Sequence, residues 1–327
     1  MSLKYIDLFC GIGGFHQAMK DLHPDSECVL ACDIEPDTRV IYELNHDMTP
    51  VGDIYDIASK DIPEHDILFG GFPCQPFSST NRYHTDKDKK GILFEQIVRF
   101  LKVKQPEYFL LENVRNIQRI QNGAAFARIK VELTEAGYEV YTQVLCATDF
   151  GLPQARYRMF FVGVRKDIQH PFEFPKGDPT KMRLLKDVLH PWDENSLYRA
   201  SDKIIQHRRA NRLEQARIDG KDETWAIPPI DLNFPRIWDY NPAKRKGELF
   251  CRVNISKKSI AHTLRALCDP AAHLINGILR YSPREQLLLQ GFPKDFQHDP
   301  DPRVAQRHAG NAVAVPVVEA ILKELLK

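Results

Sequence analysis

The chain has 327 residues, which is enough for one large domain or two of ordinary size. Hydrophobic residues make up 43% and charged residues 27%, which is typical of a soluble globular protein and excludes a disordered chain. The net charge of +1 excludes a polycation, yet residues 178–280 hold 19 lysines and arginines against 13 acidic residues, a local net charge of +6. This segment predicts a surface that binds a polyanion, with an ordinary basic surface as an equal alternative.

The seven cysteines are odd in number and include no CxxC pair. We therefore expect neither a disulfide framework nor a zinc knuckle, and no metal site. The first residues, MSLKYID, contain no apolar leader, and no run of 18 apolar residues occurs. The sequence thus predicts a cytoplasmic protein with reduced thiols and no membrane association.

The chain begins with the pattern of a nucleotide-binding α/β unit. Residues 4–9 (KYIDLF) predict a strand, residues 10–14 (CGIGG) a glycine turn, and residues 15–22 an amphipathic helix. Glycine lets the backbone approach a ligand closely. A dinucleotide fingerprint would need a third glycine at position 16, where this chain has His16, so the match to a NAD site is poor.

A second strand is expected at residues 28–32, and it ends at Asp33. An acidic residue at this place usually binds ribose hydroxyls, and its spacing from the glycine turn fits that role. A helix should follow at residues 36–45. The next short element, residues 51–54, contains Asp53, which either accepts from an adenine amino group or caps a turn.

Residues 66–69 (DILF) predict a buried parallel strand, and Pro73 must end it because proline cannot donate to a strand ladder. Cys74 therefore lies on a turn at the carboxyl end of a strand, where open α/β sheets bind ligands. It is a candidate nucleophile, although a small buried cysteine would give the same local pattern. The polar loop at residues 79–90 is expected to be a lid that closes on an anionic substrate, and residues 91–103 to be a helix.

The next strand, residues 108–111, ends in Glu112, so Cys74 and Glu112 follow consecutive strands and are expected at one site. After a helix at residues 124–136, two strands at residues 138–147 and 159–164 predict a hairpin. Arg156 and Arg158 lie between them or at their edge, two residues apart in an extended segment, and so point the same way. One of them could reach a buried carboxylate or an anion; a surface ion pair is the alternative.

From residue 172 onward prolines interrupt the pattern, and helical periodicity is clear only near residues 202–216. Basic clusters with interspersed aromatic residues are typical of nucleic-acid binders, but the aromatics could equally form a small core. Residues 282–285 (SPRE) predict the start of a helix, and residues 316–326 an apolar helix. We expect an α/β domain at residues 1–177, completed by residues 305–327, and a smaller irregular domain at residues 178–304.

Six motifs in this order resemble those of the C5-cytosine DNA methyltransferases of bacterial restriction-modification systems. The resemblance covers nearly the whole chain, and it depends on DLFxGxGG at residues 7–14, GFPCQ at 71–75, ENV at 112–114, QxRxR at 154–158, RxxPRE with QGFP at 280–293, and GNAV at 310–313. It implies a Rossmann-like, S-adenosylmethionine-dependent methyltransferase domain, with a mostly parallel sheet and helices on both faces, and a target-recognition domain.

The resemblance also implies the residues that hold the cofactor S-adenosylmethionine: Phe9, Gly11, Gly13, Gly14, Asp33, Ile34, Asp53, Ile54, Pro73, Leu93, Asn311 and Val313. Two of these depart from the family pattern, which usually has Glu where Asp33 stands and an aromatic residue where Ile34 stands. A shorter acid can still bind a diol and isoleucine can still pack on a ring, so we expect the cofactor to bind. The sequence does not determine whether these two changes weaken the affinity.

In the implied reaction Cys74 adds to C6 of a cytosine flipped out of duplex DNA, because the thiolate is a good nucleophile at neutral pH. Glu112 would donate to N3, and Arg158, with Arg156 beside it, would hold Glu112 and the cytosine O2. The DNA contacts implied are Ser78, Arg82 and Thr263.

We expect a monomer, since a methyltransferase that acts on one strand at a time needs no twofold symmetry. The resemblance further implies a partner in function, a restriction endonuclease acting on the same site. Two alternatives are a methyltransferase for a tRNA cytosine and a catalytically silent DNA-binding module. The first usually has Pro-Pro-Cys where this chain has Phe72-Pro73-Cys74, and the second would not need the three catalytic side chains.

Overall fold

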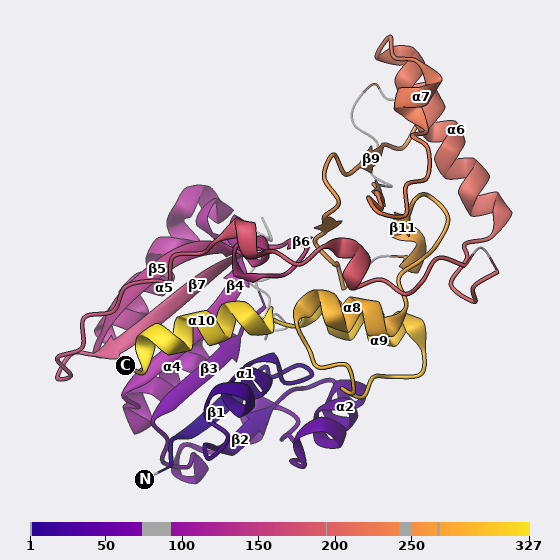
Figure 1. The fold of residues 1–327 in the computed structure, drawn as a ribbon. Coiled ribbons are helices and arrows are strands. Elements are labelled where there is room, and N and C mark those ends of the chain that lie inside the picture. Colours follow the sequence, from indigo (N-terminus) through magenta and orange to yellow (C-terminus); the bar gives the residue numbers. More distant parts are fainter. Residues whose placement is uncertain (1, 74–92, 194, 242–246, 248–249, 267–268) are drawn as a thin grey trace. The chain divides into compact units, whose positions relative to one another are not determined.

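The computed structural model describes residues 2–73, 93–193, 195–241, 247, 250–266 and 269–327 (Figure 1). Its contacts divide the chain into two compact units. The first unit comprises Met1–Cys146, Tyr157–Gly177 and Ala312–Lys327, and the second comprises Ala147–Arg156 and Asp178–Asn311. Relative to the expected domains, residues 147–156 and 305–311 are assigned to the second unit, because the hydrogen bonds of Arg156 and Gly310 tie both segments to it.

A six-stranded sheet forms the centre of the first unit, with strand order β2-β1-β3-β4-β7-β5. The four strands from β2 to β4 run parallel, whereas β7 is antiparallel to both of its neighbours. The hairpin expected from the sequence is thus the pair β5 and β7. The strands are β1 Lys4–Leu8, β2 Glu27–Cys32, β3 Ile67–Gly71, β4 Tyr108–Val114, β5 Tyr138–Cys146 and β7 Tyr157–Arg165.

Helices cover both faces of this sheet. Phe15 stacks on Phe69 at 5.2 Å on one face, and Phe126 contacts Phe161 at 5.7 Å on the other. The strand registers place Phe69 and Phe161 on opposite faces, so each helix layer buries its own set of apolar side chains. The helices are α1 Gly14–Leu22, α2 Pro36–His46, α4 Leu93–Lys104, α5 Ala124–Glu135 and α10 Val315–Leu325.

The parallel strands end at a common edge, and the expected site residues follow these ends. β1 leads into the glycine turn, β2 into Asp33 and β3 into Pro73. Gly71, the last residue of β3, is in register with Glu112 of β4. The edge where α/β sheets bind ligands therefore carries the polar residues that the sequence singled out.

The second unit combines short strands with helices (Figure 1). β6 pairs in parallel with β10, and β8 lies between β11 and β9 in an antiparallel sheet. The elements are β6 Gln154–Ala155, α6 Asp202–Ile218, α7 Glu223–Ala226, β8 Ile237–Tyr240, β9 Val253–Ile255, β10 Ala261–His262, β11 His273–Ile275, α8 Pro283–Gln290 and α9 Pro302–Asn311. No helix among the described residues of either unit is long and apolar enough to cross a bilayer.

Two arginines of α6 belong to the core of the second unit and not to its basic surface. The Arg208 guanidinium lies 3.2 Å from the centre of the Tyr240 ring, and that of Arg212 lies 3.7 Å from the Trp225 ring. Both arginines are buried. Trp238 is buried as well, whereas Trp225 and Phe234 are 39% and 38% exposed, so the core interpretation, one of two from the sequence, holds for only some of the aromatic residues.

Candidate active site

The glycine turn after β1 has three residues in the left-handed conformation: Phe9 with φ 55°, Gly11 with φ 55° and Gly13 with φ 87°. Such a conformation is unusual for phenylalanine, and strained residues of this kind gather at ligand sites. A side chain on Gly11 would meet no atom within 4 Å, so open space lies against the backbone there. The turn therefore has room for a ligand at Gly11.

Asp33 joins the end of β2 to this turn. Its Oδ2 accepts from the Gly11 amide at 2.9 Å, and its Oδ1 accepts from the Glu35 amide at 2.9 Å. Burial raises the pKa of Asp33, against the opposing effect of these two amides. The next residue, Ile34, is 62% exposed, which leaves an apolar surface beside the carboxylate.

Aromatic and imidazole rings support the turn from beneath. The His46 ring stacks on His16 at 4.1 Å and its Nε2 lies 3.3 Å from the Ile12 carbonyl, while His16 Nδ1 lies 2.8 Å from the Tyr42 hydroxyl. Burial lowers the pKa of His16 to about 3 and that of His46 to about 4, so both are neutral at pH 7. The neutral, stacked rings of His16 and His46 thus pack against the glycine turn and support it. The sequence did not predict this support.

The remaining residues expected at the cofactor site have these positions. Val313 packs against Gly14, where an added Cβ would lie 2.6 Å from its side chain. Asp53 caps a short 3-10 turn by accepting from the Tyr55 amide at 3.0 Å. Of the other residues expected to hold the cofactor, Ile54 is buried, and Pro73 and Leu93 are half-buried. Asn311, which belongs to the second unit, is exposed.

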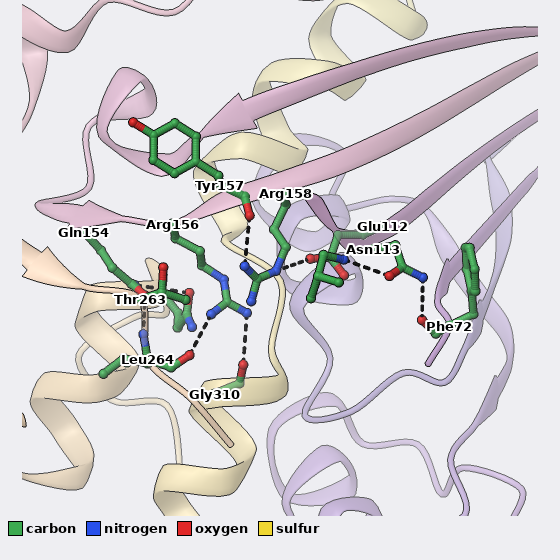
Figure 2. Close-up of polar contacts among 12 residues, drawn as sticks. Phe72, Glu112, Asn113, Gln154, Arg156, Tyr157, Arg158, Thr263, Leu264 and Gly310 are labelled. Carbon is green, nitrogen blue, oxygen red and sulfur yellow. Dashed lines mark hydrogen bonds and ion pairs between the residues drawn. The ribbon is translucent and has the colours of Figure 1, made fainter. Parts of the chain in front are cut away.

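Glu112 and Arg158 form a nearly buried ion pair (Figure 2). Arg158 Nε lies 2.7 Å from Glu112 Oε1, and the two side chains are only 13% and 11% exposed. Arg158 also donates from Nη1 to the Tyr157 carbonyl at 2.9 Å. Val114 of β4 is in register with Arg158 of β7, so adjacent strands bring the acid and the guanidinium together. The sequence anticipated that one arginine of this segment could reach a buried carboxylate.

Asn113 connects this strand to the segment that leads to Cys74. Its buried side chain donates from Nδ2 to the Phe72 carbonyl at 3.0 Å and accepts from the Val114 amide at 2.8 Å (Figure 2). Sequence reasoning assigned no role to Asn113. The signal available in the sequence was an asparagine within an apolar strand, because a buried amide side chain needs hydrogen-bond partners.

Arg156 binds two backbone carbonyls of the second unit. It is 2% exposed and donates to the Leu264 carbonyl at 3.2 Å and to the Gly310 carbonyl at 3.0 Å (Figure 2). The Thr263 hydroxyl donates to the Ala155 carbonyl at 2.6 Å. These hydrogen bonds of Arg156 and Thr263 are made with the protein backbone, and their expected roles toward substrate stay predictions.

Three further predicted site residues lie outside the described residues: the nucleophile Cys74 and the DNA contacts Ser78 and Arg82. The same holds for the loop at residues 79–90 that was expected to be a lid. Gly71 and Pro73 mark where the chain enters this segment.

Solved structures of similar fold are methyltransferases. The chain matches the crystal structure of the S. pombe Dnmt2 methyltransferase with a TM-score of 0.74 and 19% identity, covering 99% of this chain and 98% of that one. It matches a putative DNA modification methyltransferase from an E. coli prophage with a TM-score of 0.69 and 20% identity, covering 99% of each chain. The fold is therefore that of a methyltransferase, as predicted.

The family model for the C-5 cytosine-specific DNA methylases matches residues 3–327, and the chain belongs to this family. It is 37% identical over 321 residues to the type II methyltransferase M.NgoBI of Neisseria gonorrhoeae, covering 98% of this chain and 92% of that protein. It is 31% identical over 327 residues to M.HhaI of Haemophilus parahaemolyticus, covering 98% and 93%. The predicted family and the predicted activity, that of a DNA (cytosine-5-)-methyltransferase, are confirmed.

Proposed function

We propose that this enzyme transfers a methyl group from S-adenosylmethionine to C5 of a cytosine flipped out of a specific duplex DNA sequence. The observation that carries the proposal is the buried pair of Glu112 and Arg158, whose acid is in register with Gly71, three residues before Cys74. Together with Cys74, the carboxyl group and the guanidinium of this pair would supply a nucleophile, a proton donor and a fixed positive charge.

The residues around the glycine turn fit S-adenosylmethionine. Gly11 faces open space, Asp33 presents a carboxylate for ribose hydroxyls, and Ile34 offers an exposed apolar side chain on which an adenine can pack. Asp53 and Ile54 would contact the adenine edge. When bound, the cofactor supplies the methyl group that C5 receives.

The protein's task is to make C5 nucleophilic. The Cys74 thiolate would add to C6. The Glu112 carboxylate, which is paired with Arg158 in this structure, would take up a proton when cytosine binds and donate it to N3 as the ring becomes electron-rich. Arg158 would hold Glu112 in place and stabilise the cytosine O2. After C5 has taken the methyl group, water would accept the C5 proton, N3 would return its proton to Glu112, the C5–C6 double bond would re-form and the thiolate would be expelled. Flipping the base costs a few kcal/mol, which backbone contacts would offset.

The second unit would bind duplex DNA, since residues 178–280 carry a net charge of +6. Ser78, Arg82 and Thr263 would contact the strand near the flipped base, Thr263 through the oxygen that also donates to Ala155. The relatives are named type II methyltransferases. By analogy the enzyme would act as a cytoplasmic monomer, alongside an endonuclease that cuts the same unmethylated site.

The test is transfer of labelled methyl from S-adenosylmethionine to mixed-sequence duplex DNA, with the same DNA single-stranded and with bulk tRNA as parallel substrates. We expect 5-methylcytosine in the duplex and at least a 10³-fold loss in Cys74→Ala, because the covalent route is removed. Transfer to tRNA alone would replace the proposal by an RNA activity. Binding of duplex DNA without transfer would favour a silent binding module.

A further inference from the structure

The Asp53 loop, residues 53–61, is described throughout and has two 3-10 turns, Ile54–Asp56 and Ser59–Asp61, as its regular structure. Each turn has three residues. Turns of this length are weakly stable by themselves, so contacts from outside the loop must fix its shape. Asp53 Oδ1 accepts from the Tyr55 amide at 3.0 Å, and no described residue donates to Oδ2. Oδ2 can therefore accept from a ligand, provided that the loop holds it in place.

This loop starts beside Asp33, the acid proposed to bind the ribose hydroxyls. The Asp33 amide donates to the Val51 carbonyl at 3.0 Å, and the Val51 amide donates to the Ala31 carbonyl at 2.8 Å. Val51, two residues before Asp53, is thus bound to the carboxyl end of β2. A ribose at Asp33 and an adenine edge at Asp53 are therefore compatible with one nucleoside that lies along this edge of the sheet.

One side chain of α4, that of Arg99, binds the Asp53 loop at three places. Its Nη1 donates to the Ile57 carbonyl at 2.9 Å and to Ser59 Oγ at 3.2 Å, and its Nη2 donates to the Ile54 carbonyl at 3.2 Å. Its Nε donates to Gln96 Oε1 of the same helix at 2.7 Å, which orients the guanidinium plane. A guanidinium can make all these bonds at once because its donors form a rigid fork, whereas an ammonium has a single nitrogen.

Packing and hydrogen bonding make separate contributions to the loop. The side chains of Ile54 and Ile57 are buried in the same hydrophobic core as Phe94 of α4. This burial keeps the loop on the protein, because removing apolar side chains from water is favourable. It does not fix the direction of the Asp53 carboxylate, since apolar contacts are non-directional. The hydrogen bonds of Arg99 are directional, so they determine the path of the main chain next to Asp53.

We propose that Arg99 is a positioning residue for the cofactor, and that it holds the Asp53 loop so that Asp53 Oδ2 accepts from the adenine amino group. An acceptor selects one base only when it is fixed, because a mobile carboxylate can turn away from a group that it should reject. Arg99 thereby makes the site specific for adenine by acting through the loop. The inference rests on the proposed function, in which S-adenosylmethionine binds at this edge of the sheet.

The experiment measures binding without DNA, by calorimetric titration with S-adenosylhomocysteine and with its inosine counterpart, which has an oxygen in place of the adenine amino group. The wild-type enzyme should prefer the adenosine compound by about 10-fold or more, because a carboxylate accepts from the amino group and repels the oxygen. In Arg99→Lys and Arg99→Gln the preference should fall to about 3-fold or less, through weaker binding of the adenosine compound. Arg99→Lys keeps the charge and covers the case in which Arg99→Gln fails to fold.

A double-variant comparison shows whether Arg99 acts through Asp53. Asp53→Asn puts a donor where Oδ2 stands and should lose the preference for the adenosine compound by itself. Adding Arg99→Lys to Asp53→Asn should then change the preference no further, because two residues that act on one contact are not additive. A second, independent loss in the double variant would overturn the inference.

Arg165→Lys is the matched control, because Arg165 donates to the Gln105 carbonyl just beyond the other end of α4. It should lower stability in urea unfolding and leave the preference unchanged. A wild-type preference in a folded Arg99 variant would overturn the inference, as would equal weakening of both compounds, which a general loss of structure produces. Equal binding of both compounds by the wild-type enzyme would overturn it too. If the wild-type enzyme bound neither compound, the proposed function would fail and this inference with it.

Discussion

At the scale of single residues, the ion pair of Glu112 and Arg158 combines a proposed catalytic role with a structural cost. Taking two charges out of water is expensive, and each side chain is less than 15% exposed, so each depends on the other for compensation. A change at Arg158 will therefore reduce stability as well as activity, and the two effects must be separated.

We expect Arg158→Ala to lower the free energy of unfolding by about 3–5 kcal/mol, because it leaves the Glu112 carboxylate buried without its cation. Adding Glu112→Gln should restore much of that stability, since a neutral amide does not need the cation, but methyl transfer should stay lost in both. Urea unfolding and single-turnover methyl transfer measure the two quantities. Equal stability of the single and double variants would contradict this account.

Asn113 gives a second prediction at this scale. Asn113→Asp has nearly the same shape but replaces the Nδ2 donor by an oxygen that faces the Phe72 carbonyl. We expect a loss of about 1–3 kcal/mol in unfolding free energy and up to about 10²-fold in the rate of methyl transfer, with little change in the KM for DNA, because the segment before Cys74 is displaced. Asn116→Asp, in the exposed turn Arg115–Gln118, is the control. A folded Asn113→Asp enzyme with the wild-type rate would refute a positioning role.

At the scale of elements, the glycine turn contains two glycines of the same backbone conformation in different surroundings. Gly11→Ala should cost only about 1–2 kcal/mol for the left-handed backbone, yet it should abolish binding of S-adenosylmethionine because its methyl group enters the open space. Gly13→Ala should cost more stability, since its Cβ would lie 2.2 Å from His46 Nε2 within a buried ring stack. Urea unfolding and calorimetric titration with the cofactor distinguish the two; the reverse order of stabilities would be inconsistent with this structure.

The helices and strands show what local sequence can predict. Apolar runs gave the parallel strands, and the capping box at Ser282 and Glu285 marked the start of α8. Helix α9 was missed because Gln306 and His308 are among its buried residues, so it lacks an apolar stripe, and packing against α8 stabilises it. The burial of Arg208 depends on a ring that lies far along the chain, and charge patterning cannot reveal such a contact.

The candidate site likewise has features that the sequence could predict and features that it could not. The pairing of Glu112 with Arg158 was implied by the resemblance, and the motifs, each of which is short, identified the family. Two other features could not be derived: the Asn113 contact with Phe72 and the support of the turn by His46. Each joins segments at least 34 residues apart outside any motif, and only tertiary packing determines them.

At the scale of the whole molecule, His16 and His46 predict sensitivity to acid. Their pKa values are about 3 and about 4 in the folded state against 6.5 unfolded, so their contribution to stability is present above pH 6.5 and is lost as the pH falls from there toward 3–4. Between pH 7 and 5 we expect each to lower the unfolding free energy by about 2 kcal/mol. Burial raises the pKa of Asp7, which acts in the opposite sense, so the comparison must be with a variant.

That variant is His46→Gln, measured by urea unfolding at both pH values. Its stability should fall less between pH 7 and 5 than that of the wild-type enzyme, because the lowered pKa of His46 no longer contributes. A wild-type slope in the His46 variant would show that folding does not lower the pKa of this imidazole.

The first unit is completed by residues 312–327, whose helix α10 packs on α1 and whose Val313 lies against Gly14. On the ribosome this segment is the last of these 327 residues to emerge, after every residue of the second unit. The apolar face around α1 thus stays uncovered until translation of this sequence is finished. A message cut short before the codons for residues 312–327 should therefore yield a chain that chaperones and proteases remove, and not a partly active enzyme that marks DNA.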